Sequence, residues 1–138
     1  PEIDLQAYHN SKTAALFIAA ARAGAVSVGA SDLAWRALGE HLGHPMQVRR
    51  FRGNLWLEGL APWEEEAWVG REIAIGDVRF RVDEPIGRCR ATEASPVSGG
   101  YDAPTVAGLR KARGHTEFGV YATVIEGGVL AEGAAVSA

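Results

Sequence analysis

The sequence of 138 residues contains one cysteine, Cys89, and therefore lacks the pair of thiols that an internal disulfide requires. Small secreted domains are often rich in disulfides, whereas thiols stay reduced in the cytoplasm. The cysteine count therefore favours a reducing compartment, and we expect a cytoplasmic protein. At this length the chain is expected to fold as one domain with a sizeable core.

Long hydrophobic runs are also missing. The most apolar stretch, residues 14–21, is far shorter than the roughly 20 residues that a membrane-spanning helix needs. Arg22 interrupts it and a mixed polar segment precedes it, so we expect a buried helix that begins near Asn10 or Ser11 and ends by Gly24. A signal peptide or anchor is the alternative. We expect no membrane partner.

Excess positive charge is absent, because the formal net charge is -3 at pH 7. A protein that binds nucleic acid through bulk charge needs a basic surface, so we expect no nucleic-acid partner. The cations are nevertheless unevenly spread, with eleven of the fourteen Lys and Arg residues between Arg49 and Arg113. A cationic middle in an acidic chain suits a small anionic ligand. The alternative is a set of solvated strand and helix faces.

Several motifs for catalysis and metal binding are missing as well. The sequence has no CxxC pair, no GxSxG nucleophile turn, no Walker phosphate loop and no dinucleotide-binding glycine fingerprint. Its four histidines are scattered, so a structural zinc site is not expected. His115 could pair with Cys89 as a Cys–His nucleophile, although nothing in the sequence brings the two together.

What the chain does contain is a series of short strand patterns with two or three helix patterns, which predicts an α+β domain. The clearest element is a hairpin around Gly76 and Asp77 that ends in residues 78–82, where alternation places Val78, Phe80 and Val82 on the core face. Residues 83–87 are expected to break its ladder. We also expect helices capped by Asp32 and by Asp102, and strands at residues 25–28, 48–51, 55–57, 118–125 and from 129 onward.

The lone cysteine lies between two arginines, Arg88 and Arg90. A thiolate is both a nucleophile and a soft metal ligand, and neighbouring cations favour the thiolate form. The alternative is that Cys89 is a small buried hydrophobe, as most free cysteines are. The flanking charges make Cys89 the first candidate for chemistry.

Eight short motifs surround Cys89 in a fixed order, and each is weak alone. They are a strand and helix at 25–42, Arg-Phe-Arg-x-Asn at 50–54, an acidic loop with Trp at 63–68, Ile-Gly-Asp at 75–77, Arg-Cys at 88–89, an Asp-led helix at 102–114, Phe-Gly-Val-Tyr-Ala at 118–122 and Gly-Gly at 127–128. In this order they resemble the MOSC domain, a family named for the C-terminal domain of molybdenum-cofactor sulfurases. The resemblance covers residues 25–138, and we assign residues 1–24 to an N-terminal helical segment.

The resemblance implies a β-barrel-rich fold with two or three peripheral helices and one functional cysteine. In members related to the amidoxime-reducing molybdenum proteins, that cysteine ligates molybdenum, which is carried by a pterin with a phosphate group. Cys89 matches the metal-ligand position, and the cofactor-binding residues implied are Arg50, Arg52, Asn54, Arg88 and Thr92. The residue types agree, since a soft metal prefers a thiolate and a phosphate prefers arginine forks.

The implied activity is that of a molybdenum-cofactor-dependent oxidoreductase, which reduces N-hydroxylated or N-oxide small molecules with electrons from a separate protein. Two alternatives stay open: a sulfur carrier that receives a persulfide on Cys89 from a sulfur-donor protein, and a binding module without chemistry. Residues 94–99 depart from the family's Asp-Pro-x-Thr-Gly loop, and residues 133–134 depart from its Gly-Asp. The reductases also carry a further N-terminal barrel, so we expect this chain alone to retain the cofactor weakly.

Overall fold

A computed structural model describes the backbone of residues 25–138 and the side chains from Ala34 onward. The helix expected between residues 10 and 24 lies outside this range. The elements in chain order are β1 (Ala25–Ser31), α3 (Asp32–Leu42), η2 (Val48–Phe51), β2 (Leu55–Leu57), η3 (Glu64–Trp68), β3 (Glu72–Ile75), β4 (Val78–Gly87), η4 (Arg90–Glu93), α4 (Thr105–Arg113), β5 (Glu117–Glu126) and β6 (Val136–Ser137), where η marks a 3-10 helix. Within the described range, no helix has the length and apolar character that crossing a membrane requires.

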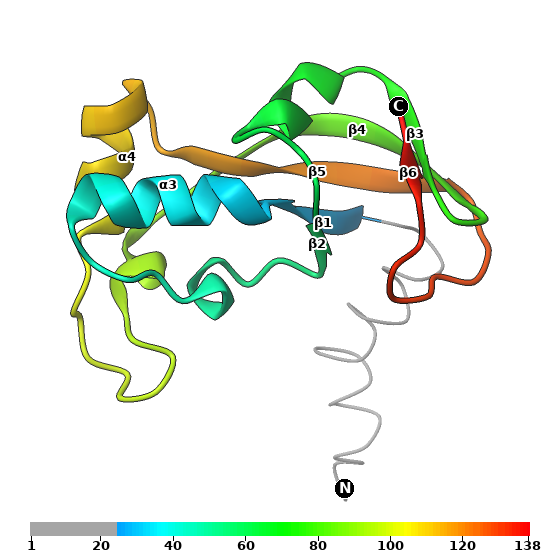
Figure 1. Cartoon of the computed structure of the whole chain (residues 1–138). Coiled ribbons are helices and arrows are strands. Elements are labelled where there is room, and N and C mark those ends of the chain that lie inside the picture. Colours follow the sequence, from blue (N-terminus) through cyan, green and yellow to red (C-terminus); the bar gives the residue numbers. More distant parts are fainter. Residues whose placement is uncertain (1–24) are drawn as a thin grey trace, which may run out of the picture.

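The described strands form one six-stranded sheet in the order β2-β1-β5-β4-β3-β6. β1 and β2 are parallel and are connected through α3, whereas every other neighbouring pair is antiparallel. The helices α3 and α4 lie at one end of the sheet, and β3 and β6 lie at the other (Figure 1). This confirms the α+β class. The expected barrel is not confirmed, because among the described strands β2 and β6 are the two ends of the sheet and do not pair with each other.

The predicted hairpin is confirmed. β3 and β4 pair antiparallel around Gly76 and Asp77, and Val78, Phe80 and Val82 of β4 are buried. The ladder does not break after residue 82, as the sequence predicted, but continues to Gly87. Irregular register at residues 82–84 and 85–87 accommodates the proline in this stretch, in the manner of β-bulges.

Two other expectations are wrong in detail. Val48–Phe51 is a 3-10 helix rather than a strand, because the backbone N–H of Arg50 donates to the carbonyl of Gln47 and that of Arg52 donates to Arg49. Four residues are too few to distinguish the two-residue repeat of a strand from the repeat of a helix, so the sequence pattern could not decide between them. The last strand is confined to Val136–Ser137, and the residues from 129 to 135 form a loop with a turn.

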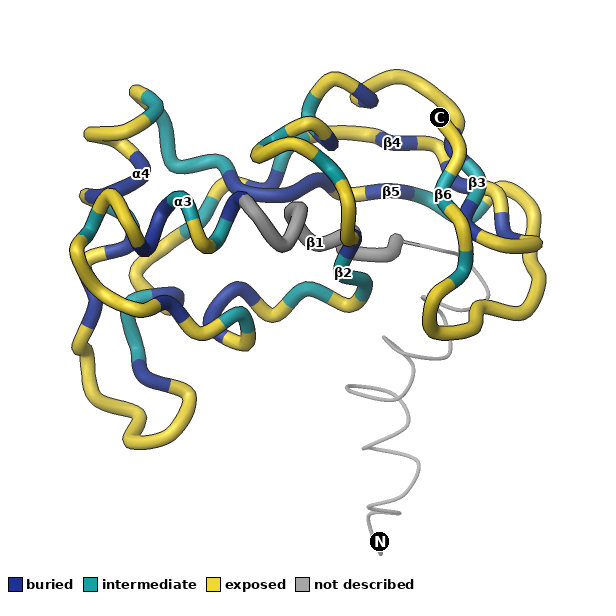
Figure 2. The backbone as a smooth tube through the Cα atoms, viewed as in Figure 1, coloured by how far each residue is buried: buried dark blue, intermediate teal, exposed yellow. Residues whose placement is uncertain are grey.

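The buried side chains of the described residues form two hydrophobic clusters. The first packs against the middle strands of the sheet and consists of Leu57, Trp68, Ile73, Ile75, Val78, Phe80, Val82, Val120 and Ala122. The second lies where α3, α4 and η2 meet the start of β5 and consists of Ala34, Leu38, Met46, Phe51, Ala103, Leu109 and Phe118. Figure 2 shows the buried segments along β4 and β5 and the exposed loops around them. The second cluster is the support for the arginine motif, because Phe51 belongs to it.

We predict that the stack of Phe51 on Phe118 is a main contribution to stability. Both rings are fully buried, and their centroids lie 4.1 Å apart at an interplanar angle of 14°. Phe118→Ala should lower the free energy of unfolding by about 3–5 kcal/mol, because it leaves a cavity in a packed core. The measurement is urea denaturation, with Val97→Ala as the control because Val97 is 85% exposed. Equal losses in the two variants would contradict this assignment of the core.

Candidate functional site

Cys89 lies just after β4, as the residue that precedes the 3-10 helix η4. Its side chain is exposed. Its carbonyl oxygen accepts hydrogen bonds from the backbone N–H of Thr92 at 3.1 Å and from the Thr92 hydroxyl at 3.0 Å. The backbone at the cysteine is therefore fixed while the thiol faces solvent. This exposure excludes the alternative in which Cys89 is a buried hydrophobe.

Arg88 fixes the chain immediately before the thiol. Its Nε donates to the carbonyl of Phe118 at 2.8 Å, and its Nη1 donates to the carbonyl of Phe51 at 2.7 Å. The guanidinium carbon lies 5.8 Å from the centre of the Phe51 ring and 5.9 Å from that of Phe118. Burial lowers the pKa of the Arg88 guanidinium, and the charges of Tyr121 and Cys89 oppose that shift. One arginine thus links β4 to both η2 and β5.

The Phe-Gly-Val-Tyr-Ala motif at residues 118–122 contains a glycine with a positive φ. Gly119 has a φ of 78°, a conformation that residues with a Cβ rarely adopt. It lies in β5, next to the part of the ladder where the register between β4 and β5 is irregular, at Pro85 to Gly87. At this irregularity the carbonyl of Phe118 accepts the hydrogen bond from Arg88. The glycine of Phe-Gly-Val-Tyr thus lies beside the point where the arginine is anchored.

Arg50 is held inside the protein. Its side chain is 1% exposed, and its Nη2 lies 2.6 Å from the Oδ1 of Asp102. Its Nη1 donates to the carbonyl of Glu93 at 3.3 Å. These contacts join η2 to the end of η4 and to the segment before α4. They also explain why α4 begins at Thr105 and not directly after the expected cap, since the Asp102 carboxylate pairs with Arg50.

Arg52 has the opposite environment, although it is only two residues away. It is exposed, and its side chain has no hydrogen-bond or ion-pair partner among the residues that the structure describes. Its backbone is left-handed, with a φ of 50°, where η2 ends. Phe51, the residue before it, is the one whose carbonyl binds Arg88. The fold therefore places an exposed guanidinium directly after the residue whose carbonyl Arg88 binds.

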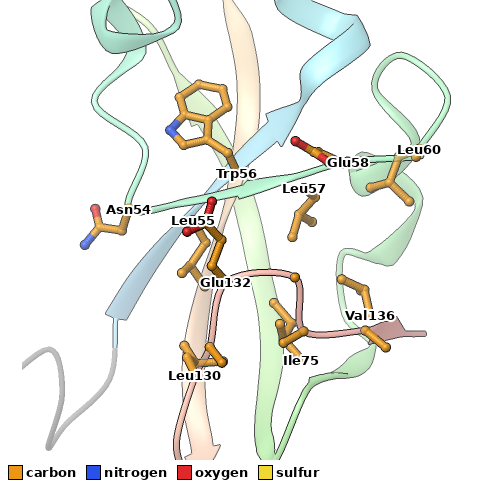
Figure 3. A pocket seen from close by; sticks show the side chains of 15 residues that line it. Asn54, Leu55, Trp56, Leu57, Glu58, Leu60, Ile75, Leu130, Glu132 and Val136 are labelled. Atoms are coloured by element: carbon orange, nitrogen blue, oxygen red, sulfur yellow. The ribbon is translucent and has the colours of Figure 1, made fainter.

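The two remaining predicted residues differ in the same way. Thr92 is buried, and besides the Cys89 carbonyl its hydroxyl lies 2.6 Å from that of Thr105 at the start of α4. That hydroxyl is occupied by the protein itself. Asn54 is exposed and lies at the rim of a cavity beside β2 (Figure 3). Thr92 is close in sequence to Cys89, and Asn54 is close in sequence to Arg52. The Thr92 side chain is buried, whereas the Asn54 side chain is exposed.

Sequence analysis missed an exposed pair that follows the cysteine. The guanidinium of Arg90 stacks on the ring of Tyr101, 4.3 Å from its centre, and its Nε lies 3.6 Å from Glu93 Oε2. Tyr101 is brought there by a bridge to Ala94, which closes the loop from residue 95 to 100. The one signal in the sequence that could have indicated this pair is an aromatic residue, Tyr101, directly after the Ser-Gly-Gly of the loop. The pair forms a flat, cationic surface beside η4.

His115 does not pair with the thiol in this structure. Its Nδ1 accepts the backbone N–H of Glu117 at 3.2 Å and lies 3.6 Å from the Oε2 of the same residue. The Cys–His alternative therefore gains no support. Across the described part of the chain, no three His, Cys, Asp or Glu side chains are grouped closely enough to hold a metal ion.

Comparison with known proteins identifies the family to which the chain belongs. The family model of the MOSC domain matches residues 15–137. "Molybdenum cofactor sulfurase 2" of Culex quinquefasciatus is 36% identical over 75 residues, which are 54% of this chain and 10% of that protein. "Molybdenum cofactor sulfurase" of Anopheles gambiae is 39% identical over 75 residues, with the same two shares. The match thus spans about a tenth of the length of these relatives.

A shorter part of the chain also matches a protein with a different name. "Geranylgeranyl diphosphate synthase" of Cereibacter sphaeroides is 47% identical over 47 residues, which are 34% of this chain and 16% of that protein. Because this match is confined to about a third of the chain, it carries less weight than the family match over residues 15–137.

We predict that substituting Arg50 by Ala lowers the free energy of unfolding much more than substituting Arg52 by Ala. Removing one partner of a buried ion pair costs about 3–5 kcal/mol, and partial exposure of Asp102 should reduce this to about 2–3 kcal/mol for Arg50→Ala. Arg52→Ala should change the free energy of unfolding by less than about 0.5 kcal/mol, as at other exposed positions. Urea denaturation of both variants, of Asp102→Ala and of the double variant Arg50→Ala/Asp102→Ala tests this. Additive effects of Arg50→Ala and Asp102→Ala would show that the pair contributes nothing.

Proposed function

The chain belongs to the MOSC domain family, and on that basis we propose that it binds a molybdenum cofactor, with the Cys89 thiolate as the protein ligand of the metal. The observation that carries the proposal is the exposed thiol on a fixed backbone, directly after an arginine that joins three segments. A soft metal selects such a donor over the hard oxygen ligands on the same surface.

The surrounding residues fit a ligand that carries a phosphate. Arg52 offers an exposed guanidinium without a partner among the described residues, and Arg88 has a buried Nη2 that lacks one within the same range. Guanidinium groups bind phosphate through charge-assisted, often bidentate, hydrogen bonds. We therefore propose Arg52, Arg88 and Asn54 as cofactor-binding residues. Arg50 and Thr92 instead hold η2 and η4 in place, since Nη1 and Nη2 of Arg50 and the hydroxyl of Thr92 already have internal partners.

The proposed reaction is reduction of an N-hydroxylated or N-oxide small molecule. A bound molybdenum cofactor supplies two-electron chemistry at the N–O bond. Converting N–OH to N–H consumes two electrons and two protons and releases water, and the electrons come from a separate electron-transfer protein. Within this chain, Cys89 presents the thiolate, Arg88 fixes its backbone, and Arg52 binds the phosphate. We propose a cytoplasmic location, where the thiol stays reduced.

A second candidate is a sulfur carrier, and two observations favour it. The thiol is exposed enough to meet another protein, and the sulfurases of Culex quinquefasciatus and Anopheles gambiae are named for sulfur chemistry on this cofactor. In that reaction the Cys89 thiolate attacks the outer sulfur of a donor persulfide, and the donor's thiolate leaves. Cys89 then carries the sulfane sulfur. The two candidates share Cys89 but differ in whether the cofactor protects it.

We predict that added molybdenum cofactor slows alkylation of Cys89 by iodoacetamide, because a metal-bound sulfur is not a free nucleophile. Mass spectrometry of the modified peptide gives the rate with and without cofactor. Cys89→Ser should bind no metal yet keep its stability within about 0.5 kcal/mol, since the side chain is exposed. An unchanged alkylation rate, together with sulfane sulfur received from a cysteine desulfurase, would replace the reductase by the carrier.

A further prediction concerns the phosphate. Arg52→Ala should weaken cofactor binding by about 1.5–3 kcal/mol, or roughly ten- to a hundredfold, which is typical of a lost charge-assisted hydrogen bond. Arg71→Ala is the matched control, because Arg71 is also exposed but lies beside β3. Calorimetric titration of both variants measures the difference. If the two arginines have the same effect, Arg52 acts only through net charge.

A further inference from the structure

The two end strands of the sheet line one cavity, and Cys89 is not among its lining residues. The cavity has a volume of about 1020 Å³. One wall is β2 with the residues around it, from Asn54 to Leu60, and the other is the segment from Leu130 to Val136, with Ile75 of β3 between them. Figure 3 shows Leu55, Leu57, Leu130, Ile75 and Val136 in the space between these walls.

Both walls have an unused edge for strand pairing. Among the described strands, β2 pairs with β1 and β6 pairs with β3, and neither has a neighbour on its other side. The two strands have only three and two residues, so neither gains much from its single neighbour. Backbone groups on such an edge are a template for another extended segment. We refer to the cavity between these edges as the seam.

The floor of the seam is apolar, because it continues the first hydrophobic cluster. Leu57 and Ile75 are members of that cluster, and Leu55, Leu60 and Val136 pack against it. An added strand would direct every second side chain toward this floor. The inward-facing positions of the occupant should therefore be apolar.

The rim of the seam carries charge of one sign. Glu58 and Glu132 are its charged lining residues, both are exposed, and neither has an ion-pair partner among the described residues. The alternate side chains of an added strand, which face outward, would lie near these carboxylates. Opposite charges at such positions favour association and fix which partner is accepted.

We propose that the seam binds an extended segment of a partner protein, with alternating apolar and basic residues, as an additional β-strand. The proposal rests on the lining of the seam and not on a bound cofactor, although Asn54, which we propose as a cofactor-binding residue, also lines the seam. The β3 wall of the seam lies at the start of β4, where Ile75 pairs with Val78, whereas Cys89 follows the end of that strand. The β2 wall is level with the later part of β4, because Leu55 and Val120 both pair with Val28 of β1, and Val120 pairs with Pro85. Cys89 is exposed and is not among the residues that line the seam, so an occupant of the seam leaves the thiol accessible.

The experiment uses two nine-residue peptides with blocked ends, one alternating Val and Lys and the other alternating Val and Glu. Hydrogen exchange of the protein should show new protection at residues 55–58 and at residues 130–136 with the Val-Lys peptide. Calorimetry should give at least tenfold weaker binding of the Val-Glu peptide. The double substitution Glu58→Lys and Glu132→Lys should reverse this preference, and urea denaturation verifies that the variant is folded.

Several results would overturn the proposal. Protection of both segments in the protein without peptide would mean that another part of the same chain already covers the seam. Equal binding of the two peptides, or a preference that survives the double substitution, would show that the carboxylates do not select the partner. Protection confined to residues outside the two walls would place the peptide elsewhere, whatever its affinity.

Discussion

The guanidinium of Arg88 is the contact on which the candidate site depends, because it satisfies carbonyls from two segments that are distant in sequence. Those carbonyls belong to Phe51 in η2 and Phe118 in β5. The same two residues stack their rings on each other in the second hydrophobic cluster. A backbone carbonyl inside a protein costs free energy when it has no donor, so the arginine stabilises the approach of η2 to the sheet. It also fixes the residue that follows it, which is Cys89.

The Arg-Phe-Arg motif shows how one short sequence can have three separate roles. Arg50 points inward to Asp102, Phe51 fills the core, and Arg52 remains in solvent. A strand would have placed both arginines on the same face. The 3-10 helix and the left-handed residue at its end place them in different environments instead. The division between a structural cation and an available one therefore originates in backbone geometry rather than in residue type.

This division also marks the limit of what could be predicted from the sequence. Strict alternation predicted the β3–β4 hairpin correctly. Flanking charge made Cys89 a candidate for chemistry, and the structure shows that this residue is exposed. The motif order predicted a family that the comparison confirms. The pairing of Arg50 with Asp102 could not be predicted, because it joins residues from two loops whose approach depends on the whole fold. The open ends of the sheet were missed for a similar reason, since strand closure is decided by tertiary pairing and not by local pattern.

The exposure of Cys89 has a practical consequence for physical studies of this domain. A thiol-directed fluorophore or spin label would attach at one position without any substitution, because the sequence has no other cysteine. The backbone beneath the label is restrained by the two hydrogen bonds from Thr92, so the reporter's motion would come mainly from its own linker. The distance from such a probe to a second label near Val78, at the start of β4, would report changes in the length or curvature of that strand.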